Sequence, residues 1–521
     1  MADRADRVDS VDTAERVGAA ERDLHLLERV CPEGVRGRRI HFIGVGGSGI
    51  SSALWLAGEH GAVVSGCDIA ATSSFKLLAS RGMEVTLGHA AEHLEGADLV
   101  AVSPFLTYRH PDLPELVAAR ERGIPIAKWQ ALLGFLMRGR AVVSVAGVHG
   151  KGSTTALIGS LAARAGLDPT VEVGATSIEW GLNSRLGHSD FFINEADEWD
   201  HNFLHYHPRV AVLTAVEYDH PEYYRSYDEI RDAFVAFLRG MDFDARAGGR
   251  PPDAPTQSSA GGHPLDAPTP TLVINADSEG CRDVLARVRD LPLAVTTFGL
   301  ERDDADVRGE EVVVGAETSF VLRLRGVRLG HVTLSTPGRT SVYNAVAAAA
   351  AASALGVPAE QLVAGLGAWP GLRRRFEIVP DGDVTFVDDY AHHPHAVALA
   401  LETARARFPG RRIVAVFQPT LFTRLHRFLT PFSEAFDAAD QVVIVEIQPS
   451  READTGLIHG SALSDAIAAR PHFAARPGSS VYGGDFTDTA ALLRKLRRPG
   501  DVIVVMGSGP VNQVIAGVRE S

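Results

Sequence analysis

The stretch AVVSVAGVHGKGSTT, residues 141–155, holds the clearest chemistry in the chain. A predicted strand at 141–146 enters a glycine-rich turn around Lys151. Ser153 and Thr154 follow the turn and precede an apolar helical pattern, ALIGSLAARAG. Small residues let backbone N–H groups point into one concavity, and a lysine beside them can reach the outer phosphates of a nucleotide. A neighbouring hydroxyl is suited to Mg²⁺. The stretch predicts a phosphate-binding loop; a plain glycine turn between strand and helix is the alternative.

Acidic side chains follow the next two predicted strands. The segment DFFINEADEWD (190–200) ends in four acids, and PRVAVLTAVEYDH (208–220) ends in acids and a histidine. Parallel strands present their carboxyl ends to one crevice, so we expect these groups to converge near the phosphate loop. A strand-end carboxylate beside such a loop commonly holds Mg²⁺, and a solvated acidic loop is the alternative. The groups are Glu195, Asp197, Glu198, Asp200, Glu217, Asp219 and His220.

A second glycine-rich turn lies near the N-terminus. RRIHFIGVGGSG (38–49) reads as a strand entering a turn that contains Gly46, Gly47 and Gly49, and the next predicted strand ends at Asp68. This spacing is typical of a dinucleotide-binding unit, in which the diphosphate lies over the glycines and the acid binds a ribose hydroxyl. The alternative is an ordinary strand–helix–strand crossover in which Asp68 caps a helix.

Strands are also predicted at 384–397, 412–424, 441–447 and 501–511, with helical patterns between them. This alternation predicts a doubly wound α/β domain. Adjacent histidines do not usually face one ion together, so we give metal binding by the histidine pair in this region little weight. The polar residues at the strand ends are Asp388, Asp389, His392, His393, Gln418 and Arg424.

The predicted fold class is α/β with three domains, because 521 residues exceed what one core usually organises. We expect a Rossmann-like N-terminal domain at 38–137 and a central P-loop ATPase-like domain at 138–370. The central domain carries a Pro/Gly-rich insertion near 244–270. A C-terminal Rossmann-like domain spans 371–521. Residues 1–37 form a polar extension, either a loose helix or disordered, to which we assign no function.

The composition of the chain restricts the kinds of molecule that it can bind. With 45% hydrophobic and 22% charged residues the chain is typical of soluble globular proteins, and a net charge of −14 argues against nucleic-acid binding. No apolar run is long enough for a membrane span, and the charged N-terminus lacks the apolar stretch of a signal peptide. We therefore expect a cytoplasmic protein without membrane insertion. Cys31, Cys67 and Cys281 lie far apart, which suits a reducing compartment and gives no metal-ligand spacing.

Eight segments together carry a family resemblance. In chain order they are HFIGVGGSGISS, GVHGKGSTT, EADEWDHNFL, AVEYDHPEYY, GLRRRFE, DDYAHHPHAV, FQPTLFTR and VMGSG. Their order and their span, nearly all of residues 38–510, resemble the Mur ligase family. The resemblance implies a first domain for a UDP-sugar, a second for ATP, and a third that closes over both and helps to orient ATP and an amino acid.

The resemblance also implies roles for single residues. Lys151 neutralises the β- and γ-phosphates of ATP. A first Mg²⁺ is bound by Glu195 and a hydroxyl of Ser153 or Thr154, and His220 serves a second. The implied nucleotide-binding residues are Gly147, His149, Gly150, Lys151, Gly152, Ser153, Thr154, Asn344, Arg374 and Asp389. The implied substrate-binding residues are Gly46, Gly47, Gly49, Asp68, His393 and Arg424, and the implied catalytic residues are Lys151, Glu195, His220, Arg374 and His393.

The implied reaction is ATP-dependent ligation of an amino acid, L-alanine favoured, to the carboxylate of UDP-N-acetylmuramate in peptidoglycan precursor synthesis. A carboxylate does not react with an amine at neutral pH. Attack on the γ-phosphate first makes an acyl phosphate, whose carbonyl the amine then attacks. Charge develops on the transferring phosphoryl group, so positioning and cations supply most of the catalysis. ATP and Mg²⁺ are the implied cofactors, and the expected assembly is a monomer or homodimer.

Some positions depart from the family's pattern and leave the adenine contacts and the choice of amino acid open. They are Gly152, Ala215, Thr340, Ser341, Thr420 and Pro510. One alternative is a family member that attaches a peptide or another amino acid to UDP-N-acetylmuramate or a related carboxylate. An alternative from another class is an NAD(P)-dependent oxidoreductase, suggested by residues 40–68. A third is a relative that binds nucleotide without turnover.

Overall fold

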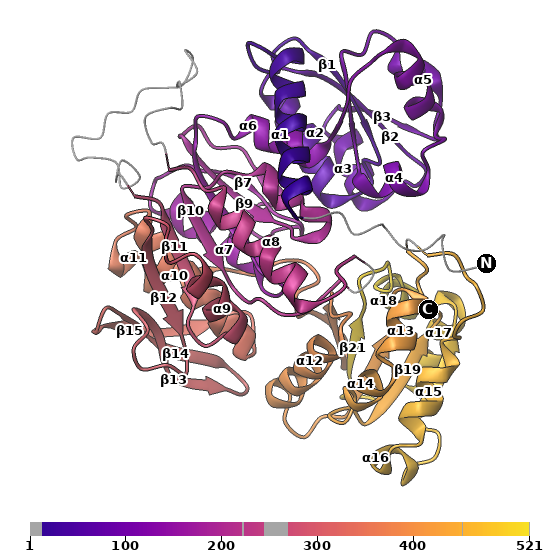
Figure 1. Cartoon of the computed structure of the whole chain (residues 1–521). Coiled ribbons are helices and arrows are strands. Elements are labelled where there is room, and N and C mark those ends of the chain that lie inside the picture. Colours follow the sequence, from indigo (N-terminus) through magenta and orange to yellow (C-terminus); the bar gives the residue numbers. More distant parts are fainter. Residues whose placement is uncertain (1–12, 221–222, 244–268, 451, 520–521) are drawn as a thin grey trace. The chain divides into compact units, whose positions relative to one another are not determined.

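The chain forms two compact units in the computed structural model, which describes residues 13–220, 223–243, 269–450 and 452–519 (Figure 1). Unit 1 consists of Met1–Glu310, Val321–Gly330 and Tyr343–Leu366. Unit 2 consists of Glu311–Phe320, His331–Val342 and Gly367–Ser521. Most of the insertion predicted near 244–270 falls outside the described residues. The strands form three sheets, and the fold is the predicted three-domain α/β arrangement with parallel sheets.

The first sheet is five-stranded and parallel, in the order β3-β2-β1-β4-β5. Its strands are β1 (Arg39–Ile43), β2 (Val63–Asp68), β3 (Glu84–Leu87), β4 (Leu99–Val102) and β5 (Ile126–Lys128). Side chains alternate between the two faces of a strand. Along β1, Ile40 and Phe42 therefore enter one core cluster, whereas Ile43 enters another on the opposite face, the face shared by His41. Both faces of this sheet are thus covered.

Helices of the first domain cover both faces of this sheet. They are α2 (Ser48–Glu59), α3 (Ser73–Ser80), the 3₁₀ helix η1 (Ala91–Leu94), α4 (Pro104–Arg109), α5 (Pro114–Arg122) and α6 (Trp129–Leu136). The N-terminal region adds α1 (Thr13–Val30), in which Ala20 and Leu27 are buried in the core of unit 1. The extension predicted as loose or disordered therefore contains a packed helix, because its few apolar residues recur at helical spacing.

The second sheet has ten strands in the order β15-β14-β13-β12-β11-β10-β6-β9-β7-β8. The bounds are β6 (Ala141–Ala146), β7 (Thr170–Glu172), β8 (Ser184–Arg185), β9 (Phe191–Ala196), β10 (Val210–Leu213), β11 (Thr271–Asn275), β12 (Ala294–Gly299), β13 (Val307–Val314), β14 (Thr318–Leu324) and β15 (Val327–Leu334). The helices are α7 (Lys151–Arg164), the 3₁₀ segment η2 (Trp199–His205), α8 (Tyr227–Arg239), α9 (Glu279–Arg287), α10 (Arg339–Ala354) and α11 (Ala359–Ala368). Central β6 runs parallel to β9 and β10, so their carboxyl ends meet at one edge.

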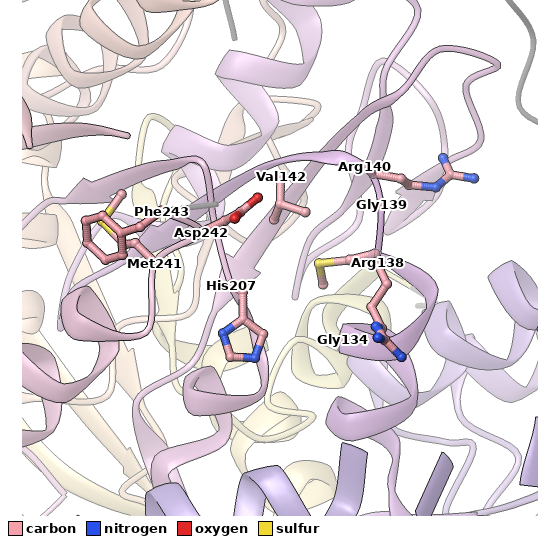
Figure 2. Close-up of a pocket in the computed structure, with 10 residues that line it drawn as sticks. Gly134, Arg138, Gly139, Arg140, Val142, His207, Met241, Asp242 and Phe243 are labelled. Carbon is pink, nitrogen blue, oxygen red and sulfur yellow. The ribbon is translucent and has the colours of Figure 1, made fainter. Parts of the chain in front are cut away.

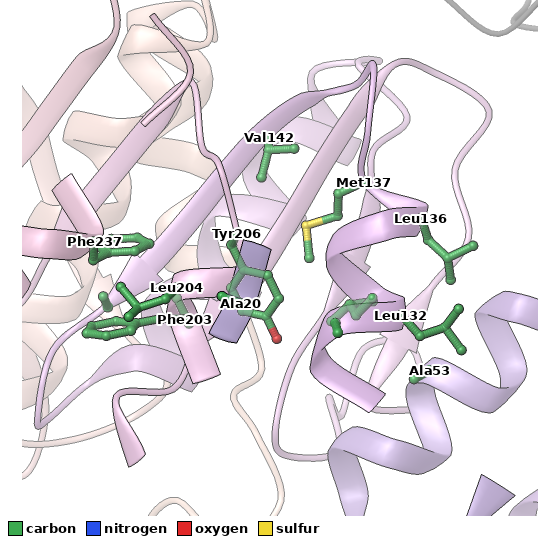
Figure 3. Packing of buried hydrophobic residues seen from close by; sticks show 14 of the residues in the cluster. Ala20, Ala53, Leu132, Leu136, Met137, Val142, Phe203, Leu204, Tyr206 and Phe237 are labelled. Atoms are coloured by element: carbon green, nitrogen blue, oxygen red, sulfur yellow. The ribbon is translucent and has the colours of Figure 1, made fainter. Parts of the chain in front are cut away.

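A continuous apolar core joins the first domain to the central sheet within unit 1. The cluster includes Ala53 of α2, Leu132 of α6 and Phe203 of η2, and it reaches Val142 of β6 (Figure 3). Phe203 stacks on Phe237 of α8, with ring centroids 4.8 Å apart. Burial of such large side chains contributes about 2 kcal/mol each. The first two domains are therefore packed as one compact unit, although each has its own sheet.

Unit 2 contains the third sheet, in the order β16-β17-β21-β18-β19-β20. Only β16 is antiparallel to its neighbour. The strands are β16 (Glu377–Asp381), β17 (Val384–Asp389), β18 (Ile413–Phe417), β19 (Gln441–Val445), β20 (Ser480–Gly484) and β21 (Val502–Met506). The helices are α12 (Pro394–Arg407), α13 (Phe422–Arg427), α14 (Leu429–Glu434), α15 (Ser461–Ala468), α16 (Pro471–Ala474), α17 (Phe486–Leu496) and α18 (Gln513–Arg519). Every helix among the described residues is too short or too polar to cross a bilayer.

Candidate active site

The predicted phosphate loop, residues 147–151, joins β6 to α7 and requires its glycines. Gly147 and Gly150 have φ of +133° and +81°, a region that side chains strongly disfavour. A Cβ on Gly147 would lie 2.2 Å from the hydroxyl of Thr214, and one on Gly150 would lie 2.3 Å from Oδ1 of Asn344. Thr214 closes the loop by donating its hydroxyl to the carbonyl of His149, at 2.5 Å. The backbone is thus held as a compact turn at the helix N-terminus.

Lys151 meets the acids at the carboxyl ends of the neighbouring strands. Its Nζ lies 2.7 Å from Oε2 of Glu198, and Nε2 of His220 lies 3.2 Å from Oε1 of the same carboxylate. Asp197 belongs to the same group, because one ligand atom from each of Asp197, Glu198 and His220 lies within 4.8 Å of the others. We call Lys151, Asp197, Glu198 and His220 the acid cluster. It confirms the predicted convergence of strand ends, with Glu198 as the shared partner.

Burial and opposite charges set the ionisation of this cluster. Burial alone would raise the pKa of Glu198, but Lys151 and His220 outweigh it and lower the pKa to about 2. Asp197 has less compensation, so burial and the charge of Glu198 raise its pKa to about 6. For Lys151, burial acts to lower the pKa, but the surrounding carboxylates raise it above its ordinary value. Near neutral pH the cluster therefore holds a charged lysine against ionised acids.

Glu195 takes a different place from Glu198. Its Oε2 accepts the amide of Gly174 at 2.8 Å, and a Cβ on Gly152 would lie 2.9 Å from that oxygen. The glycine after the lysine therefore makes room for this carboxylate. Thr154 is fully buried and donates its hydroxyl to Oδ1 of Asn344 at 3.4 Å, whereas Ser153 is partly exposed. Of the two predicted hydroxyl ligands, only Ser153 is accessible.

His149 and Asn344 are both brought to the phosphate loop. Nε2 of His149 lies 3.6 Å from a carboxylate oxygen of Glu217, at the end of the stretch after β10. Asn344 reaches the loop from α10, where its Oδ1 lies directly against Gly150. The sequence pattern alone did not show that α10 reaches the loop; the prediction for Asn344 rested on the resemblance.

Asp200, the fourth acid of the segment, is tied to other elements of unit 1. Its carboxylate lies 2.6 Å from Nζ of Lys128 and 3.2 Å from a guanidinium nitrogen of Arg16. It also accepts the hydroxyl of Tyr108 at 3.1 Å. Asp200 has a φ of +53°. These contacts connect α1 and the end of the first sheet to the segment after β9, so they fix the position of the acids just before it.

The N-terminal glycine turn follows β1 as predicted. The amide of Gly46 donates to Oδ2 of Asp68 at 2.8 Å, which places the acid against the turn. The helix after β2 is capped instead by Thr72, whose side chain accepts the amide of Phe75. A Cβ on Gly49 would lie 2.4 Å from the ring of Trp129, and Gly47 is the residue before α2. Because Thr72 caps α3, the alternative in which Asp68 caps this helix is wrong.

In unit 2, Arg374 and Asp389 lie at the carboxyl end of the third sheet. Arg374 donates to the carbonyls of Gly507 and Gly509 at 2.6 and 2.8 Å. Its Nε lies 3.3 Å from Oδ1 of Asp388. The carboxylate of Asp389 accepts two backbone amides, each at 2.7 Å, and burial raises its pKa. Arg374 is therefore paired with Asp388, whereas the carboxylate of Asp389 is held by the backbone next to it, and both predicted residues are only partly buried.

Phe428 contacts the segments of both His393 and Arg424. His393 precedes α12, and its ring is 5.5 Å from the ring of Phe428. Phe428 donates its amide to the carbonyl of Arg424, at 3.0 Å, and the side chain of Arg424 is almost fully buried. A buried arginine is suited to a carboxylate ligand.

Sequence reasoning missed the contact between Thr420 and Ser508. Their hydroxyls lie 2.8 Å apart, which joins the loop after β18 to the loop after β21. The adjacent Gln418 is buried, and its Oε1 has no hydrogen-bond partner among the described residues. Thr420 had been noted only as a departure from a pattern. The sequence offered one signal for this contact: each of the two strands is followed by a glycine- or proline-containing loop that carries a hydroxyl residue.

A pocket in unit 1 lies away from this chemistry (Figure 2). Val142 is near the amino end of β6, and Asp242 and Phe243 follow α8. The phosphate loop follows the carboxyl end of β6, where ligands of parallel sheets bind. We therefore assign the pocket no part in the site. Its lining is Gly134, Met137, Arg138, Gly139, Arg140, Val142, His207, Met241, Asp242 and Phe243.

Three protein-family models match consecutive parts of the chain and together cover most of it. Residues 39–141 match "Mur ligase family, catalytic domain", residues 145–247 and 263–352 match "Mur ligase middle domain", and residues 374–509 match "Mur ligase, glutamate ligase domain". The chain belongs to the Mur ligase family. It is an ATP-dependent ligase that forms a C–N bond, so the oxidoreductase alternative is set aside.

Two curated relatives match most of the length of this Mur ligase. A UDP-N-acetylmuramate–L-alanine ligase of Solidesulfovibrio magneticus is 36% identical over 93% of this chain and 98% of its own. One of Nitratidesulfovibrio vulgaris is also 36% identical, over 92% and 97%. Among solved structures, a UDP-N-acetylmuramate-alanine ligase of Thermotoga maritima has a TM-score of 0.73 at 24% identity and covers 91% of this chain and 97% of its own. At that identity the likeness shows the fold.

Proposed function

We propose that this Mur ligase joins L-alanine to the carboxylate of UDP-N-acetylmuramate with ATP, in peptidoglycan precursor synthesis. The observation that carries the proposal is the acid cluster, in which Lys151 and His220 share Glu198 at the mouth of the phosphate loop. The choice of substrates is supported by the two relatives that bear this name, which match over nearly their whole length. The reaction uses a nucleotide sugar and ATP, and we place it in the cytoplasm.

Lys151 is the residue we assign to the β- and γ-phosphates of ATP. Its ammonium is charged and buried beside Glu198, at the first residue of α7. A triphosphate in the loop offers the ammonium a second anionic partner, and the N-terminus of α7 adds backbone N–H groups directed at the same place. Gly147 and Gly150 keep that concavity open, because a Cβ on either would strike a neighbouring side chain.

The donor set of the acid cluster fits a divalent cation. Carboxylate oxygens of Asp197 and Glu198 lie with a nitrogen of His220 within 4.8 Å of one another, and carboxylates are the usual protein ligands of Mg²⁺. We propose that Glu198 and His220 hold Mg²⁺, with Ser153 and Glu195 at the border of the same crevice. Bound Mg²⁺ would offset the negative charge of the triphosphate and of the transferring phosphoryl group.

The remaining assignments follow the chemistry of each group. We propose that the glycine turn at 46–49 binds the diphosphate of the UDP-sugar, with Asp68 beside it. Arg374 and Asp389 are assigned to ATP, the arginine through its guanidinium. His393 and Arg424 are assigned to the amino acid, since a guanidinium pairs well with an α-carboxylate.

The proposed reaction proceeds in two steps. The muramate carboxylate attacks the γ-phosphorus, a new O–P bond forms, and ADP leaves with the electrons of the broken P–O bond. The amine of L-alanine then attacks the acyl carbonyl, loses a proton, and phosphate leaves. Lys151 holds the transferring phosphoryl group, and its fixed position supplies electrostatic stabilisation without reorganisation.

The experiment that tests the proposal is phosphate release by the purified protein with Mg-ATP and UDP-N-acetylmuramate, one amino acid at a time. We expect release that requires the sugar nucleotide and L-alanine together, with UDP-N-acetylmuramoyl-L-alanine as the product by mass spectrometry. Release with another amino acid or with a peptide would overturn the substrate assignment and keep the ligase chemistry. No release with any of these partners would overturn the proposed reaction.

A matched pair of lysine variants separates chemistry from folding in this assay. Lys151→Ala removes the loop cation, whereas Lys128→Ala removes a lysine that is also paired with a buried carboxylate, at 2.6 Å from Asp200. If both variants lost phosphate release equally while keeping their helical circular dichroism, the special place of Lys151 would be disproved.

A further inference from the structure

A second polar cluster lies in the first domain, on the face of the sheet that packs against η1 and α5. It consists of His41 of β1, Cys67 of β2, His93 of η1 and Glu115 of α5, and we call it the flank cluster. One ligand atom from each of the four lies within 4.8 Å of the other three. Cys67 and Glu115 are completely buried, and His41 is 3% exposed. None of these side chains belongs to the proposed active site.

The distances in the flank cluster are close to those of a tetrahedral metal site. Nε2 of His41 lies 3.3 Å from Sγ of Cys67, Sγ lies 3.2 Å from Oε1 of Glu115, and Nδ1 of His93 lies 2.9 Å from Oε1. With Zn–N near 2.0 Å and Zn–S near 2.3 Å, neighbouring ligand atoms of a tetrahedron are about 3.3–3.8 Å apart. Small side-chain rotations therefore suffice to place all four around one ion.

Hydrogen bonding alone does not satisfy Glu115. Its Oε1 is within 3.2 Å of four groups, namely Sγ of Cys67, Nδ1 of His89, Nδ1 of His93 and the amide of Ala90. A carboxylate oxygen has only two lone-pair directions for donors. Its Oε2 is buried and has no hydrogen-bond partner among the residues that the structure describes. A buried oxygen without a partner loses its hydration without compensation, and a cation beside the carboxylate would provide that compensation.

A neighbouring hydroxyl already orients one of the ligands, His41. Nδ1 of His41 lies 2.9 Å from the hydroxyl of Ser65, so its Nε2 is the nitrogen that faces Cys67. Metal-bound histidines usually use their second nitrogen in this way. A closed site with a sulfur ligand selects a soft, tetrahedral ion.

We propose that His41, Cys67, His93 and Glu115 form a structural zinc site in the first domain. The ligands come from two strands and two helical segments, and all four are held by the protein, which leaves no position for a reacting water. The site is linked to the predicted UDP-sugar turn, because the amide of Gly44 donates to the carbonyl of Cys67 at 2.8 Å. Zinc would thereby hold β1, β2 and α5 together beneath that turn.

The test is metal content and cobalt spectroscopy of the full-length protein without an affinity tag. We expect about one zinc per chain by mass spectrometry after purification. After removal of zinc with a chelator, Co²⁺ titration in excess Mg²⁺ should give a thiolate-to-cobalt charge-transfer band and the intense visible bands of a tetrahedral ion. Mg²⁺ keeps Co²⁺ from the acid cluster, which has no sulfur ligand, so the readout is independent of ligase activity.

Cysteine variants assign the band without relying on one fragile protein. Cys67→Ser should abolish the charge-transfer band, and the matched Cys281→Ser, a buried cysteine in α9, should keep it. If Cys67→Ser does not fold, the double variant Cys31→Ser/Cys281→Ser leaves Cys67 as the single thiol and should still show the band. Substoichiometric metal in the wild type without a cobalt–thiolate band would overturn the proposal, and so would a band that survives in Cys67→Ser.

Discussion

The acid cluster and the flank cluster use similar side chains on two parallel sheets, but they occupy different parts of those sheets. The acid cluster stands where β6, β9 and β10 end, so its groups border the crevice beyond the strand ends. The flank cluster lies within the layer between a sheet and its helices, and Cys67 and Glu115 are inaccessible to water. A polar group at a strand end can reach a ligand, whereas one on a strand face can only bind what the core encloses.

The two carboxylates show the same contrast. Glu198 is matched by a lysine and a histidine, one on each oxygen. Glu115 has all its partners among the described residues on one oxygen, Oε1. A carboxylate with balanced cationic partners stays ionised and can exchange a partner for a phosphate or Mg²⁺. A buried carboxylate with partners on one oxygen only destabilises the fold, because its other oxygen is desolvated without compensation until a cation binds beside it. The position of a carboxylate in the sheet and the distribution of partners over its two oxygens therefore indicate its role better than its residue type does.

The largest expected effect is that of Lys151→Ala. Loss of the loop cation should lower kcat by about 10³-fold or more, since the lysine stabilises charge in the transition state. Steady-state phosphate release and the melting temperature would be measured together. A variant that kept a kcat near wild type would contradict the role of the acid cluster in catalysis.

Glu198→Gln and Glu115→Gln should separate the two clusters. Glu198→Gln removes the charge that Lys151 and His220 share, and we expect kcat to fall about 10²-fold. Glu115→Gln should lower the melting temperature by several degrees, with kcat per folded molecule close to wild type, because Glu115 touches no substrate. Equal loss of kcat in both variants would erase the distinction.

Alanine substitutions at two glycines of α7, Gly152 and Gly159, should have smaller effects, one on catalysis and the other on stability. A Cβ at Gly152 would lie 2.9 Å from Oε2 of Glu195, and one at Gly159 would lie 2.8 Å from the side chain of Val171. Gly152→Ala should displace a carboxylate and lower kcat about tenfold. Gly159→Ala should strain apolar packing at a cost of about 1–3 kcal/mol and lower mainly the melting temperature. A reversed pattern would show that Glu195 has no part in the site.

A buried histidine outside both clusters should give the smallest effect. Burial, aided by Arg16, lowers the pKa of His201 from 6.5 to about 4. The folded state thus binds fewer protons than the unfolded state between these values. The stabilising contribution is fully present above pH 6.5 and is lost as pH falls towards 4, about 2 kcal/mol at pH 5.

The measurement for His201 is the melting temperature at pH 7 and pH 5. His201→Gln should show a smaller drop between the two than the wild type, because glutamine takes up no proton. His110→Gln, at an exposed histidine, is the control and should behave as wild type. If His201→Gln lost as much stability at pH 5 as the wild type, burial of this ring would not govern the acid response.

The phosphate loop could be read from the sequence because all its parts are contiguous. A strand at 141–146, a turn that needs glycine, and a helical pattern follow one another. β6 has the predicted bounds, whereas α7 begins at Lys151, before the hydroxyl residues that were predicted to precede the helix. The strand ends at 190–200 and 208–220 could be predicted to converge for a similar reason, since parallel order fixes where carboxyl ends meet. The α/β class followed from the alternation of strands and helices, and the expectation of three domains followed from the length of 521 residues.

Only the tertiary structure decided which acid faces Lys151. Glu195 and Glu198 look equivalent in the sequence, but the backbone turns between them, and Glu198 meets the lysine while Glu195 meets Gly174. The packing of α1 was also beyond the pattern, because its partners lie on distant elements such as η2.

The cysteines give the clearest division between what sequence and structure determined. Their spacing indicated no metal site, since ligand spacing in a sequence is informative only when the ligands share a loop or hairpin. In the fold, Cys67 meets His41, His93 and Glu115, which come from separate strands and helices. The sequence determined the local turns and the order of the elements. The packing of sheet against helix decided which distant side chains share a buried space, because that depends on every layer being in place.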